Sequence, residues 1–258
     1  MTAENADYRA APAAESDVIM RAGCLFSGIG GIELGLQRAG WRIDWQVEID
    51  ERKRAVLARH FPDARRFGDI QGVEAQELGQ VDLIAGGFPC QDLSSAGARG
   101  GITGKRSGLW AHFARLIGDL RPRYVLVENV PALLVRGMGR VLGDLASLGY
   151  DAEWDCLPAA AFGAPQLRAR IWLLAYPRGI RDEADDTVFA GRPLPELCAW
   201  WRTEPDLDRV VDGLSGGMER VGWLGDAVVP QIPEWIGARI MHAHRAELVG
   251  SRTGRSVQ

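Results

Sequence analysis

The chain has 258 residues, of which 47% are hydrophobic and 25% charged, and its formal net charge is −4. This composition argues against a disordered protein, and the length suits one α/β domain with a small addition. The negative balance is only weak evidence against a nucleic-acid partner, because 30 Lys and Arg residues can still line one cleft. We see no signal-like N-terminus and no apolar stretch of about 18 residues, so we expect a cytoplasmic protein that does not cross a membrane.

The apolar runs and the glycine and proline residues between them predict alternating strands and helices. The predicted strands are Val18–Phe26, Arg42–Val47, Val81–Ala85, Tyr124–Val127, Tyr150–Leu157 and Arg170–Ala175. The predicted helices are Ile32–Arg38, Arg52–His60, Leu109–Leu120, Met138–Leu148, Met218–Gly225 and Ile232–Ala243. This alternation is typical of a doubly wound, mostly parallel sheet, whose ligands bind beyond the carboxyl ends of the strands.

The pattern also predicts how the chain is divided. Residues 1–17 form a flexible tail, and residues 18–175 form the catalytic and cofactor-binding α/β domain. The proline-rich, charged segment 176–212 breaks the rhythm and is interpreted as a short insertion. Residues 213–245 return to the main domain, and residues 246–258 are expected to be frayed.

The first motif with chemical meaning is the glycine turn Ser27-Gly28-Ile29-Gly30-Gly31, with Glu48 at the end of the next strand. Glycines let the backbone approach a ligand closely, and an acid at that place accepts hydrogen bonds from ribose hydroxyls. The pattern favours a nucleoside-containing cofactor, although a tight packing turn between strand and helix would have the same sequence. The turn is not G-x-G-x-x-G, which weakens a dinucleotide interpretation.

The second motif is Gly86-Gly87-Phe88-Pro89-Cys90-Gln91, which follows the strand Val81–Ala85. A cysteine in such a loop is placed to act as a nucleophile, and the nearby Arg99, Lys105 and Arg106 would favour its thiolate. The alternative is a small buried side chain, which is our interpretation of the three other cysteines. The absence of a C-x-x-C pair predicts free thiols in all four positions, namely Cys24, Cys90, Cys156 and Cys198.

Glu128, in Glu128-Asn129-Val130-Pro131, follows the apolar strand Tyr124–Val127. Partial desolvation there would raise the pKa of its carboxyl group, as a proton donor near neutral pH requires. An acid that only orders a loop is the alternative.

The segment Gln166-Leu167-Arg168-Ala169-Arg170 predicts an extended stretch with Gln166, Arg168 and Arg170 on one side. Its two guanidinium groups would hold an anion or a carbonyl oxygen, and a solvated basic edge is the alternative.

Five motifs in this order resemble the cytosine-C5 DNA methyltransferases, and in particular the short bacterial and phage-type members. They are Phe26-Ser27-Gly28-x-Gly30-Gly31, Pro89-Cys90-Gln91, Glu128-Asn129-Val130, Gln166-x-Arg168-x-Arg170 and Gly225-Asp226-Ala227-Val228-Val229-Pro230. The resemblance spans about residues 22–240. It implies a Rossmann-like DNA (cytosine-5-)-methyltransferase that uses S-adenosyl-L-methionine and needs no metal.

The resemblance also implies a role for each catalytic residue. Cys90 would add to C6 of a cytosine flipped out of double-stranded DNA, which gives C5 the character of an enamine. Glu128 would contact N3 and the exocyclic amine of the cytosine, and Arg170, supported by Arg168, would contact O2.

The cofactor and DNA contacts follow from the same resemblance. Glu48 would contact the ribose, Ile49 the adenine ring and Asp69 the adenine amine. The implied cofactor residues are Phe26, Ser27, Gly28, Gly30, Gly31, Glu48, Ile49, Asp69, Ile70, Pro89, Leu109 and Asp226. The implied DNA contacts are Gln91, Ser94, Arg99, Lys105, Arg106 and Gln166.

Two departures from the family pattern bear on function. Asp226 stands where the family usually has Asn, and it would repel the carboxylate of the cofactor, go with a modified cofactor, or contact the ammonium. In the family, the region that recognises the target DNA lies in the interval that here runs from Ile171 to about Trp223. This interval is short, so we expect the recognised DNA sequence to be short or loosely specified. The candidate DNA contacts there are Arg192, Trp200, Trp201 and Arg202, and a small hydrophobic plug is the alternative for the two tryptophans.

Two other functions remain open from the sequence. One eukaryotic branch of the family methylates tRNA, but Gln91 after Cys90 favours DNA. The other is a DNA-binding regulator without catalysis. We expect a monomer, with a cognate restriction endonuclease as a further partner.

Overall fold

The computed structural model describes residues 19–89, 108–164, 166–180, 187–191 and 227–253. Their strands are β1 (Arg21–Leu25), β2 (Arg42–Val47), β3 (Arg65–Phe67), β4 (Leu83–Gly86), β5 (Tyr124–Asn129), β6 (Tyr150–Pro158) and β7 (Ala169–Pro177). Their helices are α1 (Gly31–Arg38), α2 (Glu51–His60), α3 (Ala75–Leu78), α4 (Leu109–Leu120), α5 (Leu133–Arg136), α6 (Met138–Ser147) and α8 (Gln231–Thr253). Two short 3-10 turns are η1 (Ile70–Gly72) and η3 (Ala159–Phe162).

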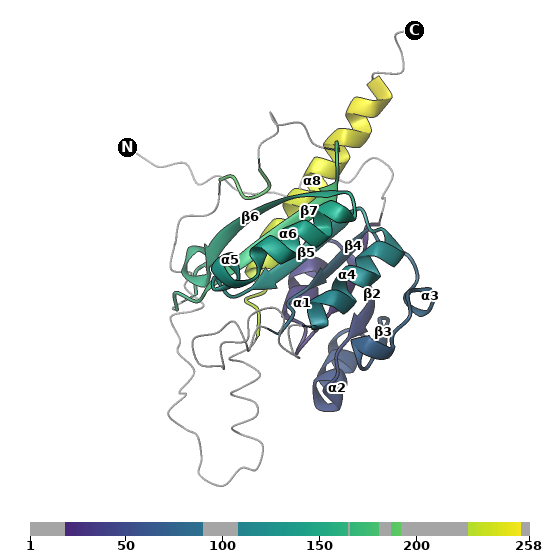
Figure 1. The fold of residues 1–258 in the computed structure, drawn as a ribbon. Coiled ribbons are helices and arrows are strands. Elements are labelled where there is room, and N and C mark those ends of the chain that lie inside the picture. The colour runs from purple at the N-terminus through teal and green to yellow at the C-terminus, as the bar shows by residue number, and fades with distance from the viewer. Residues whose placement is uncertain (1–18, 90–107, 165, 181–186, 192–226, 254–258) are drawn as a thin grey trace.

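The strands form one seven-stranded sheet in the order β3-β2-β1-β4-β5-β7-β6 (Figure 1). Strands β1 to β5 pair in parallel, whereas β7 runs antiparallel to both β5 and β6. The predicted doubly wound, mostly parallel sheet is therefore confirmed. The carboxyl ends of β1, β2, β4 and β5 meet at one edge, where β7 begins.

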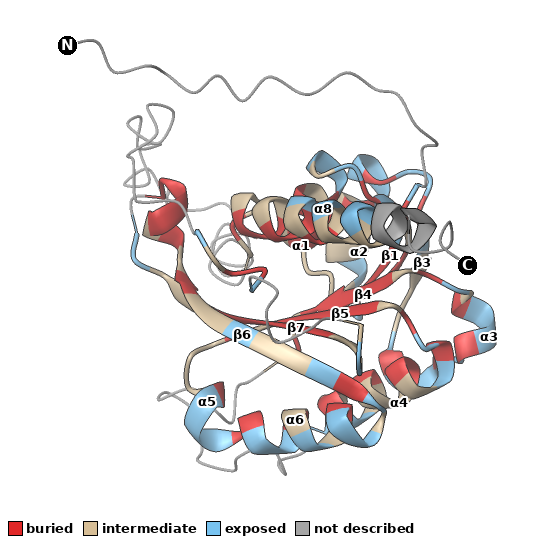
Figure 2. Cartoon of the chain, turned by 90° about the horizontal axis from the view of Figure 1, so that it is seen from above, coloured by how far each residue is buried: buried red, intermediate tan, exposed pale blue. Residues whose placement is uncertain are grey.

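Helices cover both faces of the sheet, and each face has its own apolar core (Figure 2). Helices α1, α2 and α8 lie on one face, and α4 and α6 lie on the other. The helices pack on the sheet through one apolar side, as α4 illustrates. Its buried side chains, among them Trp110, Phe113 and Ile117, recur at helical spacing along that side. The strands between these layers are apolar on both sides, as in buried parallel sheets generally.

Helix α8 packs directly on α1, although almost 200 residues separate them. The indole Nε1 of Trp41 donates a hydrogen bond of 3.1 Å to the carbonyl of Gly237, a separation of 196 residues. The close approach requires glycines in α1: a β-carbon at Gly31 would lie 2.6 Å from the carbonyl oxygen of Val228, and one at Gly35 would lie 2.3 Å from that of Pro230. The segment after the predicted motif Gly225–Pro230 thus belongs to the main domain.

Most predicted elements agree with the structure, and the differences lie at their ends. Strand β5 continues to Asn129 and so contains Glu128, and β7 continues to Pro177, into the predicted insertion. Helix α8 extends to Thr253, far beyond the predicted end at Ala243 and into the segment expected to be frayed. The helix predicted over Met218–Gly225 lies outside the described residues.

A short piece of the predicted insertion packs on the main core. Val188 and Phe189 are 4% and 5% exposed. The Nε of Arg239 in α8 donates to the carbonyl of Val188 at 2.5 Å, and the hydroxyl of Thr187 donates to the carboxylate of Glu153 in β6. Residues 187–190 are therefore tied to both β6 and α8. In the part of the chain that the structure describes, no helix is long and apolar enough to cross a membrane.

Candidate active site

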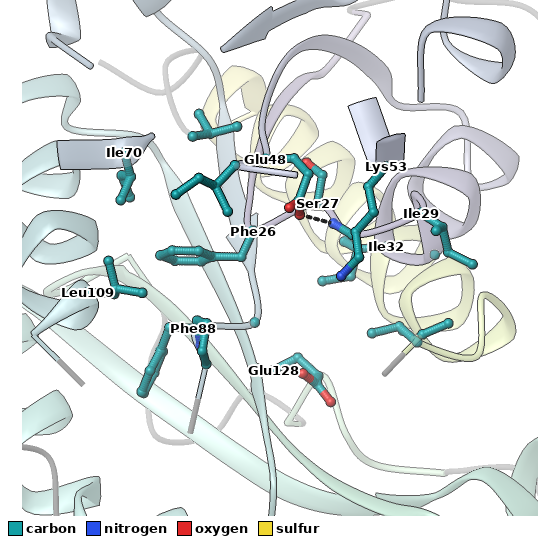
Figure 3. A pocket seen from close by; sticks show the side chains of 18 of the residues that line it. Phe26, Ser27, Ile29, Ile32, Glu48, Lys53, Ile70, Phe88, Leu109 and Glu128 are labelled. Atoms are coloured by element: carbon teal, nitrogen blue, oxygen red, sulfur yellow. Dashed lines mark hydrogen bonds between the residues drawn. The ribbon is translucent and has the colours of Figure 1, made fainter. Parts of the chain in front are cut away.

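A pocket of about 480 Å³ opens at the edge where the carboxyl ends of the central strands meet. It is lined by the segments that follow β1, β2 and β4, by the end of β5, by Arg170 at the start of β7, and by Ala227 and Val228. This is where ligands of open α/β sheets bind. Figure 3 shows the pocket with Phe26, Ser27, Glu48 and Glu128 around it.

The glycine turn and Glu48 are joined directly. The N–H of Gly28 donates to Oε2 of Glu48 at 2.7 Å, and the N–H of Asp50 donates to Oε1 at 2.9 Å. Gly28 has a φ of +56°, which favours glycine, and a side chain at this position would meet no atom within 4 Å. Glu48 is therefore fixed at the pocket wall by backbone donors, and each of its oxygens keeps a further lone pair for a ligand.

One end of the pocket is apolar. Ile70 and Phe88 are 3% and 2% exposed, and Phe26 and Leu109 pack against the same core. The Phe88 ring lies 5.4 Å from that of Trp110 in α4, centroid to centroid, which holds the wall in place. Ile49 lies at the rim and is 69% exposed, and Asp69, exposed beside it, accepts a hydrogen bond of 3.0 Å from the N–H of Gln71. The apolar walls suit a flat ring, and Asp69 suits a polar group on its edge.

Glu128 forms the acidic part of the pocket. Its Oε1 lies 3.1 Å from Nε of Arg170, and only 13% of the Glu128 side chain is exposed. Burial raises the pKa of Glu128 to about 7, and the charges of Arg170 and Arg168 oppose that rise. Burial therefore shifts the pKa of Glu128 in the direction that a proton donor near neutral pH requires.

The loop that leads to Cys90 passes immediately beside Glu128. A β-carbon at Gly87 would lie 2.5 Å from Oε2 of Glu128, so a side chain there would displace the Glu128 carboxylate. The side-chain amide of Asn129 donates to the carbonyl of Phe88 at 3.1 Å, and Asn129 is 3% exposed. The backbone of residues 87–88 is therefore held against the end of β5, and Pro89, the residue before Cys90, lines the pocket.

The prediction of an extended segment from Gln166 to Arg170 is wrong in part. Arg168 has a φ of +23°, and the carbonyls of Leu167 and Arg168 both accept the N–H of Ala159, so the chain turns sharply before β7. Arg170 lines the pocket, whereas Arg168 donates from Nη2 to the carbonyl of Ala227 at 2.7 Å. Arg168 thus supports the pocket wall, and Gln166 is exposed outside it.

Gly30 is the other correction. It does not line the pocket, because a β-carbon there would point at the Phe61 ring at 2.6 Å and at Leu57 at 3.0 Å. Its φ of +91° and its place before α1 make it a packing turn, the alternative that the sequence left open. The other described residues expected at the cofactor do line the pocket: Phe26, Ser27, Gly28, Gly31, Glu48, Ile49, Asp69, Ile70, Pro89 and Leu109.

Several predicted site residues lie outside the described part of the chain. They are Cys90, Gln91, Ser94, Arg99, Lys105, Arg106, Arg192, Trp200, Trp201, Arg202 and Asp226. Of the other cysteines, Cys24 is 1% exposed, which confirms a core position, Cys156 is half-buried, and Cys198 is outside the described residues. In the described ranges no three His, Cys, Asp or Glu side chains are grouped so that they could hold a metal ion.

The structure adds pocket residues that the sequence analysis missed. Lys53 in the first turn of α2 lines the pocket, as do Ile29, Ile32 and Val228. One sequence feature could have pointed to Lys53 as a pocket residue, namely its position in the helix that begins shortly after Glu48. The first turn of such a helix faces the ligand edge of the sheet. Nothing in the sequence reveals which face of that turn is directed inward.

Comparisons with known proteins show the family of the chain. A family model described as C-5 cytosine-specific DNA methylase matches residues 20–190. The type II methyltransferase M2.BsuMI of Bacillus subtilis (strain 168) is 39% identical over 229 residues, which cover 82% of this chain and 55% of that protein. The type II methyltransferase M.NgoBI of Neisseria gonorrhoeae is 35% identical over 177 residues, with 67% and 56% covered. The chain thus spans a little over half the length of these relatives.

Solved structures show the same fold. A protein described as a DNA modification methyltransferase encoded within a prophage (E. coli) matches with a TM-score of 0.57 and 27% identity, covering 69% of this chain and 51% of that one. The methyltransferase EhMeth of Entamoeba histolytica, at 18% identity, matches with a TM-score of 0.55 and shares the fold over 65% and 56% of the two chains. The chain belongs to the C-5 cytosine-specific DNA methylase family.

Proposed function

We propose that the protein is a DNA (cytosine-5-)-methyltransferase that methylates C5 of a flipped-out cytosine through a covalent adduct with Cys90. The observation that carries the proposal is the Glu128–Arg170 pair, placed against Gly87 in the loop that leads through Pro89 to Cys90. A carboxyl group with a pKa of about 7 and a guanidinium group at one pocket wall match the polar edge of a cytosine.

The residues of the pocket fit S-adenosyl-L-methionine. The apolar end at Phe26, Ile70 and Leu109 suits adenine, and Glu48 keeps acceptor lone pairs for ribose hydroxyls. When bound, the cofactor supplies an electrophilic methyl group. The residues that would hold it come from the ends of β1 and β2, and Glu128 lies across the pocket from them (Figure 3).

The side chains of this protein would make the cytosine reactive. The Cys90 thiolate adds to C6, and the electron pair of the C5–C6 double bond moves towards N3, where the protonated carboxyl group of Glu128 donates a hydrogen bond or its proton. Arg170 contacts O2. After C5 has been methylated, loss of the C5 proton and expulsion of the Cys90 thiolate restore the aromatic ring.

A base stacked inside a duplex cannot reach such a pocket, so the substrate would be double-stranded DNA from which one cytosine is flipped out. The two named relatives are type II methyltransferases, which supports a restriction-modification role with a cognate endonuclease as partner. A monomer suffices for this chemistry.

Trapping of the adduct tests the proposal. Duplex DNA that carries 5-fluorocytosine should form, with the cofactor present, a complex that survives denaturation, because the C5 fluorine cannot leave as a proton does. Cys90→Ser should abolish the complex, and Cys156→Ser, the control, should keep it. A complex that is unaffected by Cys90→Ser would refute the role of Cys90, and trapping by a matched tRNA but not by DNA would refute the DNA substrate.

A further inference from the structure

We propose that Lys53 binds the carboxylate of the methionine portion of S-adenosyl-L-methionine and so selects cofactors that carry that group. The inference rests on the proposed function, because it takes this cofactor as the ligand. No sequence motif pointed to Lys53, and the comparisons assign it no role.

Lys53 is placed at the pocket by the start of α2. The carboxylate of Asp50 caps the helix by accepting from the N–H groups of Arg52 at 2.8 Å and Lys53 at 3.3 Å. Because Asp50 follows two residues after Glu48, this cap fixes the first helical turn beside the pocket wall. Lys53 is half-buried there and is one of the lining residues.

Figure 3 shows how the pocket residues are ordered. Ile70 and Leu109 stand on one side, Glu48 and Ser27 in the middle, and Lys53 and Ile29 on the opposite side, with the Lys53 side chain extending into the space. S-adenosyl-L-methionine has the same linear order of groups, namely adenine, ribose and amino acid. With adenine at the apolar end and ribose at Glu48, the amino-acid end falls at Lys53.

The charges around Lys53 leave its ammonium for a ligand. Within the described residues the Lys53 side chain makes no hydrogen bond and no ion pair. The other described cation of the pocket, Arg170, is engaged by Glu128 at 3.1 Å. Glu48 accepts from two backbone N–H groups. An anionic group at this end would therefore find one cation there, and a charge-assisted hydrogen bond to a carboxylate is among the stronger polar contacts.

Two ligands that differ only in the cofactor carboxylate test its contact with Lys53. Decarboxylated S-adenosylmethionine keeps the adenine, the ribose, the sulfonium and the ammonium, and lacks only that group. Calorimetric titration of the full chain should give about tenfold tighter binding of S-adenosylmethionine than of the decarboxylated form, which corresponds to loss of one charge-assisted contact. Lys53→Met should weaken binding of S-adenosylmethionine about tenfold and leave binding of the decarboxylated form unchanged.

The control is Arg59→Met, which removes one positive charge from the last turn of the same helix, outside the pocket. It should leave both affinities as they are, whereas Lys53→Arg should preserve most of the preference for the carboxylate. Equal weakening of both ligands by Lys53→Met, or no weakening of either, would overturn the proposal. Weaker DNA binding with an unchanged cofactor preference would overturn it too, in favour of a phosphate contact. If the unaltered protein binds neither ligand, it is the proposed function that fails.

Discussion

The Nε atom of Arg170 lies 3.1 Å from Oε1 of Glu128, and the two side chains are only 23% and 13% exposed. They come from neighbouring antiparallel strands, where Glu128 pairs with Trp172 and Asn129 with Ile171. The charge of Arg170 thus opposes the burial that raises the pKa of Glu128 to about 7.

Arg170→Met should therefore destabilise the protein more at pH 8 than at pH 5. At pH 8 the Glu128 carboxylate is mostly ionised and would lose its partner; because a group with a pKa of about 7 can take up a proton instead, the extra cost at pH 8 is about 1.4 kcal/mol at most. At pH 5 it is protonated and the cost is small. Urea unfolding at both pH values measures the difference, and Glu128→Gln combined with Arg170→Met should abolish it. An equal loss at both pH values would show that the pair is not an ionic one.

Glu33→Gln should stabilise the protein at pH 8 and have little effect at pH 5. Glu33 is fully buried in α1, and burial raises its pKa to about 7, with Ser27 and Gln46 as hydrogen-bonding neighbours that oppose the rise. Below the unfolded pKa of about 4.5 both states hold the proton; between 4.5 and 7 only the unfolded state loses it, so stability falls with rising pH. The neutral amide avoids that loss, which amounts to about 3 kcal/mol at most. A pH-independent difference in unfolding free energy between variant and parent would contradict this account.

Gly31→Ala should loosen the contact between α1 and Val228. The new β-carbon would lie 2.6 Å from the Val228 carbonyl oxygen, and such overpacking costs roughly 1–3 kcal/mol. Thermal unfolding should show the loss, and cofactor titration should show weaker binding, since both residues line the pocket. Gly143→Ala in α6 is the control, because its β-carbon meets nothing within 4 Å and should stabilise the helix by about 0.5–1 kcal/mol. Equal stability of the two alanine variants would argue against tight packing at Gly31.

Glu48→Gln should weaken cofactor binding more than tenfold. The amide would set an N–H₂ group against the N–H of either Gly28 or Asp50, where the carboxylate now accepts two hydrogen bonds. Titration with S-adenosylhomocysteine reads the loss directly. Glu51→Gln, three residues further on, exposed and outside the pocket, should bind as the parent does. Unchanged binding by Glu48→Gln would mean that Glu48 only orders the glycine turn.

The central strands could be predicted because buried parallel strands are short apolar runs, and β2 and α4 have the predicted ends. Strand β3 was missed since its three residues, Arg65 to Phe67, are mostly charged and gain their structure by pairing with β2. The turn at Arg168 was missed for a related reason: its φ of +23° is set by the backbone contact with Ala159, not by a glycine.

Site residues could be predicted from the sequence where the chemistry requires a particular residue type. They could not be predicted where only the three-dimensional arrangement directs a side chain into the pocket. Glu48 follows an apolar strand and Glu128 lies near the end of one, so their sequence positions place them at the ligand edge. Lys53 is one of many charged residues of α2, and its direction becomes clear only in three dimensions (Figure 3). At Gly87 the structure adds a reason for glycine that the sequence does not show, namely the carboxylate of Glu128 beside it.

The packing of α8 on α1 has a consequence for synthesis on the ribosome. A chain emerges from its N-terminus at about 5–20 residues per second, so α1 and the central strands appear long before residues 227–253. Until then Leu36 and Trp41 face water, and the pocket lacks the wall formed by Ala227 and Val228. A nascent chain of this protein therefore exposes apolar surface through most of its translation, and its pocket is complete only after residues 227–253 have emerged.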